Sequence, residues 1–155
     1  MDVGLLVDRS RSMQTYQRKL LVGIIDRLVE KIGVSKEGNH FAVGTFGPSS
    51  AIYNNLKAPE AQNAMALKKQ INQRISHVPQ DWGTRTDLAM RKANSEVFTV
   101  DGGDRPEAPN VLLVFTDGRP FKTVKDKVPW VKFEDSTKQL EVSFSLSLQD
   151  RKSVV

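Results

Sequence analysis

Two short apolar runs that each end in an aspartate constrain the fold more than any other feature of this chain. The runs are 5–7 and 111–115, and Asp8 and Asp117 follow them in polar turns. Apolar runs of this length, without alternation, are typical of strands that a sheet buries on both faces. Both aspartates are therefore expected at the carboxyl ends of core strands.

The segments between and after these runs show the periodicities of helices and of a hairpin. Residues 14–32 are predicted to form an amphipathic helix that Gly33 ends. Residues 40–46 and 51–56 predict an antiparallel hairpin around the short loop 47–50, at or near a sheet edge. Further helices are predicted over 60–76, 86–98 and 130–140, and a last strand near 142–148. The apolar side of the first helix comprises Leu20, Leu21, Ile24, Ile25, Leu28, Val29 and Ile32.

This order of elements predicts an α/β fold, a doubly wound and mostly parallel sheet with one antiparallel edge strand. With 155 residues, 39% of them hydrophobic, one domain with one sizeable core is expected. We place that domain at 1–150, with 151–155 as a tail. In such sheets, ligands bind at the carboxyl ends of the strands.

Composition and the missing motifs exclude several classes of function. The 23 basic residues outnumber the 18 acidic ones but are scattered, so the chain lacks the basic stripe of a nucleic-acid-binding protein. No apolar run approaches the roughly 20 residues of a membrane helix, and the N-terminus lacks the pattern of a signal peptide. The sequence has no cysteine, no phosphate-binding loop and no nucleophile elbow, so we expect a protein that is not an enzyme.

The turn after the first strand concentrates oxygen side chains. Asp8, Ser10 and Ser12 stand at alternate positions, where one turn can direct all three toward a single point. The second core strand, placed beside the first, brings Asp117 to the same edge of the sheet. Hydroxyl and carboxylate oxygens suit Mg²⁺ better than zinc, which prefers nitrogen and sulfur. For the loop alone, the alternative interpretation is a turn followed by a helix N-cap.

Three ordered motifs carry a resemblance to a known family. The pattern D-x-S-x-S after a strand, the later Gly83-Thr84-Arg85-Thr86 and the stretch T-D-G-R-P at 116–120 together resemble a von Willebrand factor A domain, which has a Rossmann-like fold. The last motif is most similar to the matrilin and collagen VI branch and to invertebrate extracellular-matrix relatives. The resemblance implies a metal-ion-dependent adhesion site for Mg²⁺, or for Mn²⁺ or Ca²⁺ in its place, formed by Asp8, Ser10, Ser12, Thr84 and Asp117.

The resemblance also implies a function. A cation held by few carboxylates stays electrophilic, so it recruits a glutamate or aspartate of a partner to complete its shell. The expected protein is then an adhesion module of a secreted or cell-surface parent, with an extracellular partner such as a collagen-like or other matrix protein. Two alternatives remain: a structural scaffold of a matrix, including a biomineral matrix, that does not use its metal, and an intracellular assembly platform.

Two departures from the family pattern concern the site and the end of the chain. Arg11 stands between the two serines, where the family usually has glycine. The family's closing strand and helix are not visible after Leu148, so we expect a domain shortened at its C-terminus.

Several residues near the motifs have competing interpretations. Arg11, Arg85 and Arg119 fall in the metal loops and are the candidate contacts for an acidic partner. Thr86 and Asp87 are expected to cap the following helix rather than to bind metal. For Trp82, beside Gly83, we expect a packing role, with a rim contact as the alternative, and we expect structural or surface roles for His40 and His77.

Overall fold

The computed structural model describes residues 1–76, 82–117, 120, 127 and 129. Its elements follow the order β1 (Asp2–Asp8), α1 (Thr15–Ile32), β2 (His40–Phe46), β3 (Ser50–Asn54), η1 (Pro59–Gln62), α2 (Ala64–Ile75), α3 (Thr86–Glu96) and β4 (Asn110–Phe115). Both apolar runs that end in an aspartate form strands, as predicted. The predicted elements over 130–140 and 142–148 and the tail lie outside the described residues, as do His77 and Arg119.

The described strands form one sheet in the order β3-β2-β1-β4. Strand β1 pairs in parallel with both β2 and β4, whereas β3 pairs antiparallel with β2. The predicted mostly parallel sheet with one antiparallel edge is therefore confirmed. Because Val7 pairs with Phe115, the two strands that carry the aspartates end at the same level.

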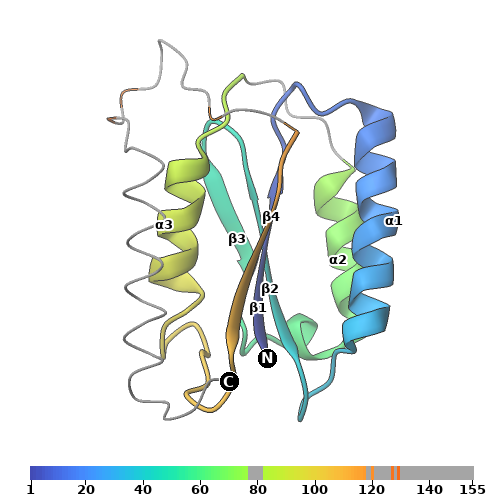
Figure 1. Cartoon of the computed structure of the whole chain (residues 1–155), viewed down its shortest axis with the longest axis vertical. Helices are drawn as coiled ribbons and strands as arrows, with labels where there is room; N and C mark the ends of the chain where they lie inside the picture. The colour runs from blue at the N-terminus through green and yellow to red at the C-terminus, as the bar shows by residue number, and fades with distance from the viewer. Residues whose placement is uncertain (77–81, 118–119, 121–126, 128, 130–155) are drawn as a thin grey trace, which may run out of the picture.

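Helices cover both faces of this sheet (Figure 1), so the doubly wound arrangement is also confirmed. Helices α1 and α2 lie on one face and α3 lies on the other. The side chains of β1 alternate between two cores. Val3, Leu5 and Val7 pack with the buried residues of α1 and α2, and Leu6 packs with Ala89 and Ala93 of α3.

The predicted apolar side of the first helix is wider than the buried one. Leu21, Ile25 and Val29 are buried, whereas Leu20 and Ile24 are exposed. The helix predicted over 60–76 is divided at Asn63, whose side-chain oxygen accepts a hydrogen bond from Ala66 N at 3.0 Å and so caps α2. Because an N-cap residue has a non-helical backbone conformation, Asn63 separates η1 from α2.

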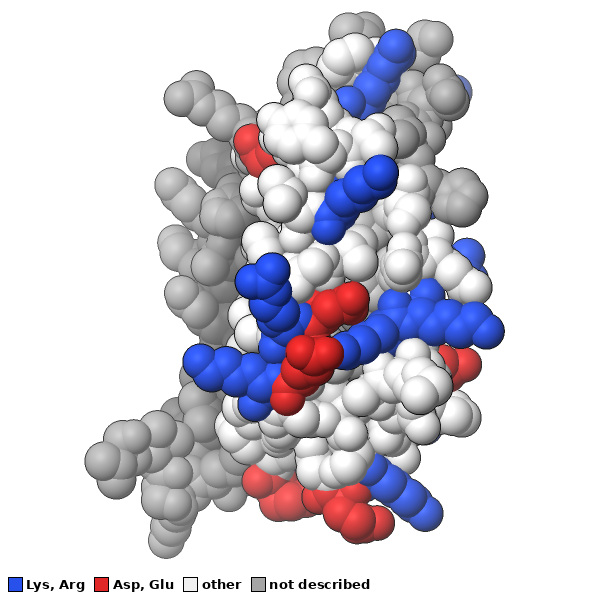
Figure 2. All heavy atoms as spheres, turned by 90° about the vertical axis from the view of Figure 1, so that its right-hand side faces the viewer, with Lys and Arg blue, Asp and Glu red and all other residues white. Residues whose placement is uncertain are grey.

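Acidic and basic side chains are interspersed on the face that α1 presents (Figure 2). This agrees with the scattered charges of the sequence. No helix in the described part of the chain is long and apolar enough to cross a membrane. His40 is buried, with its Nε2 atom 2.9 Å from the carbonyl oxygen of Lys36, so its expected structural role is confirmed.

Candidate metal centre

Asp8 anchors the first loop of the candidate site. Its side chain is fully buried at the end of β1, and both of its carboxylate oxygens accept hydrogen bonds. The backbone N–H of Ser10 donates to Oδ1 at 2.7 Å, and the hydroxyl of Thr116 donates to Oδ2 at 2.7 Å. One carboxylate thus shapes the loop after β1 and joins it to the residue that follows β4.

Three further oxygen side chains form a chain from the interior toward solvent. The hydroxyl oxygens of Ser10 and Ser12 lie 2.8 Å apart, and the Ser12 hydroxyl donates to Asp117 Oδ1 at 3.1 Å. Ser10 is buried, whereas Ser12 and Asp117 are exposed. Four of the five predicted ligands are therefore brought together, although Ser12 and Asp117 are 105 positions apart in the sequence.

Thr84 reaches the same end of the sheet through contacts of the second loop with Gly47. The N–H of Arg85 donates to the Gly47 carbonyl at 2.7 Å. A Cβ atom on Gly47 would lie 3.6 Å from Gly83 O and 3.8 Å from Ser10 N, so the two loops meet around this glycine. Thr84 is only 6% exposed, and its hydroxyl makes no hydrogen bond to any described residue.

Gly83 fixes the direction of that second loop. Its φ of 135° is a conformation that residues with side chains rarely adopt, and a Cβ atom there would lie 3.1 Å from Cβ of Pro48. Both the backbone conformation and the close packing against Pro48 therefore require a glycine at this position of the G-T-x-T motif.

A buried arginine lies beneath the first loop and was missed by the sequence interpretation. Arg18, on α1, is 1% exposed. Its guanidinium donates to the carbonyl oxygens of Met13 at 2.8 Å, Ser10 at 2.9 Å and Arg9 at 3.5 Å. The available signal was its position three residues before Leu21, on the buried side of the helix.

The second loop contains a buried ion pair where partner contact and capping were predicted. Arg85 is fully buried, and its Nε and NH2 atoms donate to the two carboxylate oxygens of Asp87 at 2.8 and 2.6 Å. It also donates to the carbonyl of Pro129 at 2.9 Å. The prediction of Arg85 as a contact for a partner is therefore wrong, because its guanidinium is enclosed and bound within the fold.

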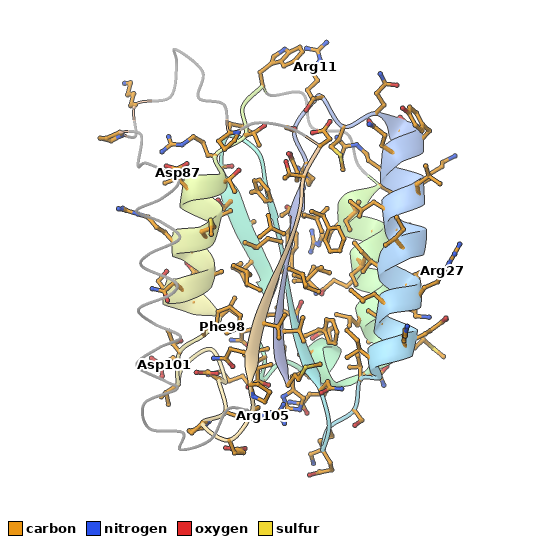
Figure 3. The ribbon with its side chains drawn as sticks, in the orientation of Figure 1. Arg11, Arg27, Asp87, Phe98, Asp101 and Arg105 are labelled. Atoms are coloured by element: carbon orange, nitrogen blue, oxygen red, sulfur yellow. The ribbon has the colours of Figure 1, made fainter. Side chains whose placement is uncertain are left out.

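The prediction that Thr86 or Asp87 caps α3 is wrong as well. The N-cap residue is Arg85, without a side-chain cap. Asp87 binds Arg85 instead, near the first turn of the helix (Figure 3). The buried Thr86 hydroxyl oxygen has no hydrogen-bond partner within the described structure.

Arg11 and Trp82 lie at the rim of the site. The Arg11 guanidinium carbon is 5.0 Å from the ring centroid of Trp82, and Trp82 is 56% exposed. Figure 3 shows Arg11 at the same end of the molecule as the strand termini that carry the aspartates, opposite Asp101 and Arg105. Trp82 is thus a rim residue, not the packing residue that we expected.

A small hollow lies next to the first loop, between Arg9 and the hairpin. Its volume is about 100 Å³, and Thr45, Pro48 and Tyr53 contribute to its lining. Arg9 NH1 donates to the Tyr53 hydroxyl at 3.0 Å, and that hydroxyl lies 2.7 Å from Thr45 Oγ1. Arg9 therefore faces the hairpin rather than the oxygen cluster.

The chemistry of the assembled donors fits a hard divalent cation. All five predicted ligands offer oxygen atoms, and the hydroxyl of the buried residue Thr84 has no hydrogen-bond partner among the described residues. No group of three or more His, Cys, Asp or Glu side chains gathers within the described residues, so hydroxyl groups must contribute if a cation binds here. Mg²⁺ and Mn²⁺ accept such oxygen ligands together with water.

Comparison with known proteins places these features in a family. The sequence model described as von Willebrand factor type A domain matches residues 2–141. Matrilin-3 of Mus musculus is 25% identical over 130 residues, which cover 81% of this chain and 26% of that protein. Human matrilin-4 is 31% identical over 121 residues, covering 76% of this chain and 19% of the relative. The chain thus spans about a quarter or less of the length of these curated relatives.

Solved structures share the fold. Proximal thread matrix protein 1 from the mussel byssus matches with a TM-score of 0.73 at 18% identity, covering 91% of this chain and 35% of that one. A second structure of that protein, with zinc in its metal-ion-dependent adhesion site, has a TM-score of 0.72 at 18% identity over the same shares of the two chains. Because the family model matches most of the chain and the sheet has the expected topology, this chain belongs to the von Willebrand factor type A domain family.

Proposed function

We propose that this chain is a divalent-cation-dependent protein-binding module. Ser10, Ser12 and Thr84 supply hydroxyl ligands, and Asp8 and Asp117 bind the cation directly or through water. The bound cation supplies an electrophilic coordination position that a glutamate or aspartate of the partner fills. The observation that carries this proposal is the oxygen chain from Ser10 through Ser12 to Asp117, whose links are 2.8 and 3.1 Å long.

The position and charge of the cluster support an open site. Only two of the five ligands are carboxylates, so a divalent cation keeps part of its charge for a partner. The outer ligands, Ser12 and Asp117, are exposed, which leaves the solvent side accessible. We propose Mg²⁺ as the resident cation, with Mn²⁺ or Ca²⁺ as substitutes. The zinc-occupied mussel protein supports a divalent cation without identifying which one this chain binds.

The relatives suggest where such a module acts. The mussel protein is named as a matrix protein, and human matrilin-4 is 31% identical to this chain over the 121 residues that align. We infer that the parent protein is extracellular, that it works by binding rather than by catalysis, and that its partner is a collagen-like or other matrix protein that presents an acidic side chain.

Calorimetric titration with MgCl₂ tests the metal site. The 155-residue chain is expected to bind Mg²⁺, and Asp117→Ala or the double change Ser10→Ala/Ser12→Ala is expected to weaken binding at least about tenfold, because even residues that only support metal ligands contribute about 10- to 100-fold. Asp101→Ala removes an exposed carboxylate at the opposite end of the molecule (Figure 3) and serves as the matched control. Equal Mg²⁺ binding by the parent and by Asp117→Ala would refute the proposal.

A scaffold that does not use its metal is the second candidate, and one observation favours it. Both oxygens of Asp8 already accept internal hydrogen bonds, so the loop is satisfied without a cation. For this candidate, binding to a matrix partner would persist in EDTA and in the Ser10→Ala/Ser12→Ala variant. For the metal-dependent module, both treatments would abolish binding.

A further inference from the structure

Arg11 is an exposed charged side chain at the rim, and it contacts the ring of Trp82. It stands between the two serine ligands, and no carboxylate of the described residues forms an ion pair or hydrogen bond with it. An arginine needed for folding would be expected to donate to carbonyls or carboxylates, as Arg18 and Arg85 do. Arg11 is instead exposed at the mouth of the oxygen cluster, and its donors have no such acceptor in the described part of the chain.

Trp82 holds this guanidinium in place. The Arg11 guanidinium carbon lies 5.0 Å from the indole centroid, which is within the range of a cation–π contact. The two residues come from different loops, one after β1 and one shortly before Thr84. A cation–π contact does not use up the N–H groups of a guanidinium, so they can still donate to a carboxylate.

We propose that Arg11 and Trp82 form a second recognition point beside the metal, and that the partner segment carries two acidic side chains rather than one. This inference rests on the proposed function, since the first carboxylate binds the cation. The second carboxylate accepts hydrogen bonds from the edge of the Arg11 guanidinium, and the exposed indole contacts the apolar part of the segment. Arg11 is then a specificity-determining residue at a position where the family usually has glycine.

The geometry favours acidic residues two positions apart. In an extended segment, alternate side chains point to the same side, and each residue advances the chain by about 3.3 Å. Two such carboxylates are therefore spaced by roughly 7 Å along one side. Arg11 directly neighbours both serine ligands in the sequence. A spacing of this order therefore allows one carboxylate to bind the metal while the second accepts hydrogen bonds from Arg11.

Two synthetic peptides test the proposal. One carries two glutamates separated by a glycine, and the other has glutamine in place of the second glutamate. With saturating Mg²⁺, NMR titration of the 155-residue chain is expected to show about fivefold tighter binding of the two-glutamate peptide, the ratio for a solvent-accessible charge pair of about 1 kcal/mol. Arg11→Ala is expected to reduce this ratio to about one while Mg²⁺ binds no more weakly than before.

Two more variants separate stacking from charge. Trp82→Ala is expected to lower the ratio because Arg11 loses its support, whereas Trp82→Phe keeps an aromatic face and most of the ratio. Arg27→Ala, which removes an exposed arginine on the outer side of α1 (Figure 3), is the control and leaves the ratio unchanged.

The outcomes distinguish this inference from the function on which it rests. If the chain binds no Mg²⁺, or binds the one-glutamate peptide equally in EDTA, the proposed metal-dependent function fails. The other case is that the one-glutamate peptide binds only with Mg²⁺, but the two peptides bind the parent equally well, or Arg11→Ala still prefers the two-glutamate peptide. Either of these results overturns the second recognition point and leaves the metal-dependent function standing.

Discussion

Arg18 lies on the buried side of α1, beneath the turn that carries Ser10 and Ser12. Burial lowers the pKa of Arg18 and the neighbouring charge of Arg9 lowers it further, whereas Asp8 and Asp117 raise it. The residue is therefore a cation buried under a loop whose carboxylates compensate part of the cost. Its bonds to the carbonyls of Ser10 and Met13 hold the backbone that orients the serine hydroxyls.

Replacing Arg18 by methionine is expected to destabilise the fold. The change leaves buried carbonyl groups without donors, and each bond to a charged donor contributes about 1.5–3 kcal/mol. We expect the free energy of unfolding to fall by about 3 kcal/mol, measured by urea denaturation in EDTA. Lys19→Met, a change at the exposed neighbour on the same helix, is the control. If the two variants are equally stable, Arg18 does not hold the loop.

The candidate ligands could be predicted from the sequence because their pattern is local. Asp8, Ser10 and Ser12 occupy alternate positions of one turn, and Asp117 follows a second apolar run. The role of Arg85 could not be predicted in this way. A loop arginine beside a candidate ligand looks exposed in a sequence, and only the tertiary fold encloses it against Asp87.

Among the elements, the bounds of β2 and α1 were easier to predict than the width of the buried side of α1. Residues 40–46 form β2 with the predicted bounds, because turn residues flank this segment at both ends. Helix α1 shows that the periodicity of apolar residues does not determine how wide the buried side of a helix is. Leu20 and Ile24 belong to its apolar pattern and are 63% and 55% exposed, since the width of the buried side depends on how the helix packs on the sheet and on α2.

Helices α1 and α2 are joined by an ion pair between Glu30 and Lys68, which gives a pH dependence. The hydrogen bond from Lys68, and next its charge, lower the pKa of Glu30. A carboxyl group whose pKa is lower in the folded state stabilises the fold above its unfolded pKa, and this contribution is lost as the pH falls through the folded pKa. The contribution is small because the carboxylate is exposed.

We therefore expect Glu30→Gln to be slightly less stable than the parent at pH 7 and equally stable once the pH is below the folded pKa of Glu30. Thermal unfolding at a series of pH values measures the difference. Glu37→Gln changes an exposed glutamate that forms no ion pair with the described residues and controls for the general effect of charge. A difference between parent and Glu30→Gln that persists in acid would contradict this assignment.

At the scale of the whole molecule, β1 carries a buried aspartate at each end, and the two are compensated differently. Asp2 accepts from Nε and NH2 of Arg105 at 2.9 and 2.6 Å and from its backbone N–H at 2.8 Å. Asp8 accepts hydrogen bonds from neutral donors, a backbone N–H and the hydroxyl of Thr116, and it attracts the buried charge of Arg18. At one end of the strand the carboxylate is hydrogen-bonded to an arginine, whereas at the other end its hydrogen bonds are to neutral donors beside the oxygen cluster where we propose a cation.

This contrast predicts opposite behaviour for two conservative changes. Asp2→Asn leaves the Arg105 guanidinium, whose side chain is 25% exposed, without its carboxylate, so we expect a loss of about 2–3 kcal/mol of unfolding free energy with Mg²⁺ affinity retained. Asp8→Asn is expected to cost less stability in EDTA than Asp2→Asn, because the two hydrogen bonds of Asp8 are to neutral donors and only the charge attraction to Arg18 is lost. It should instead abolish the stabilisation by excess Mg²⁺, which reaches about 2.7 kcal/mol at a hundred times the dissociation constant.

Urea unfolding of both variants with EDTA and with Mg²⁺ separates the two roles, because each variant controls for the other on the same strand. If Asp8→Asn loses as much stability in EDTA as Asp2→Asn does, Asp8 is a structural residue like Asp2. If Asp2→Asn also lowers the Mg²⁺ affinity, the two ends of β1 are coupled through the sheet. If neither result is found, the two ends of β1 have separate roles. The Asp2–Arg105 ion pair stabilises the fold at one end, and the Asp8 end is available to a metal and a partner.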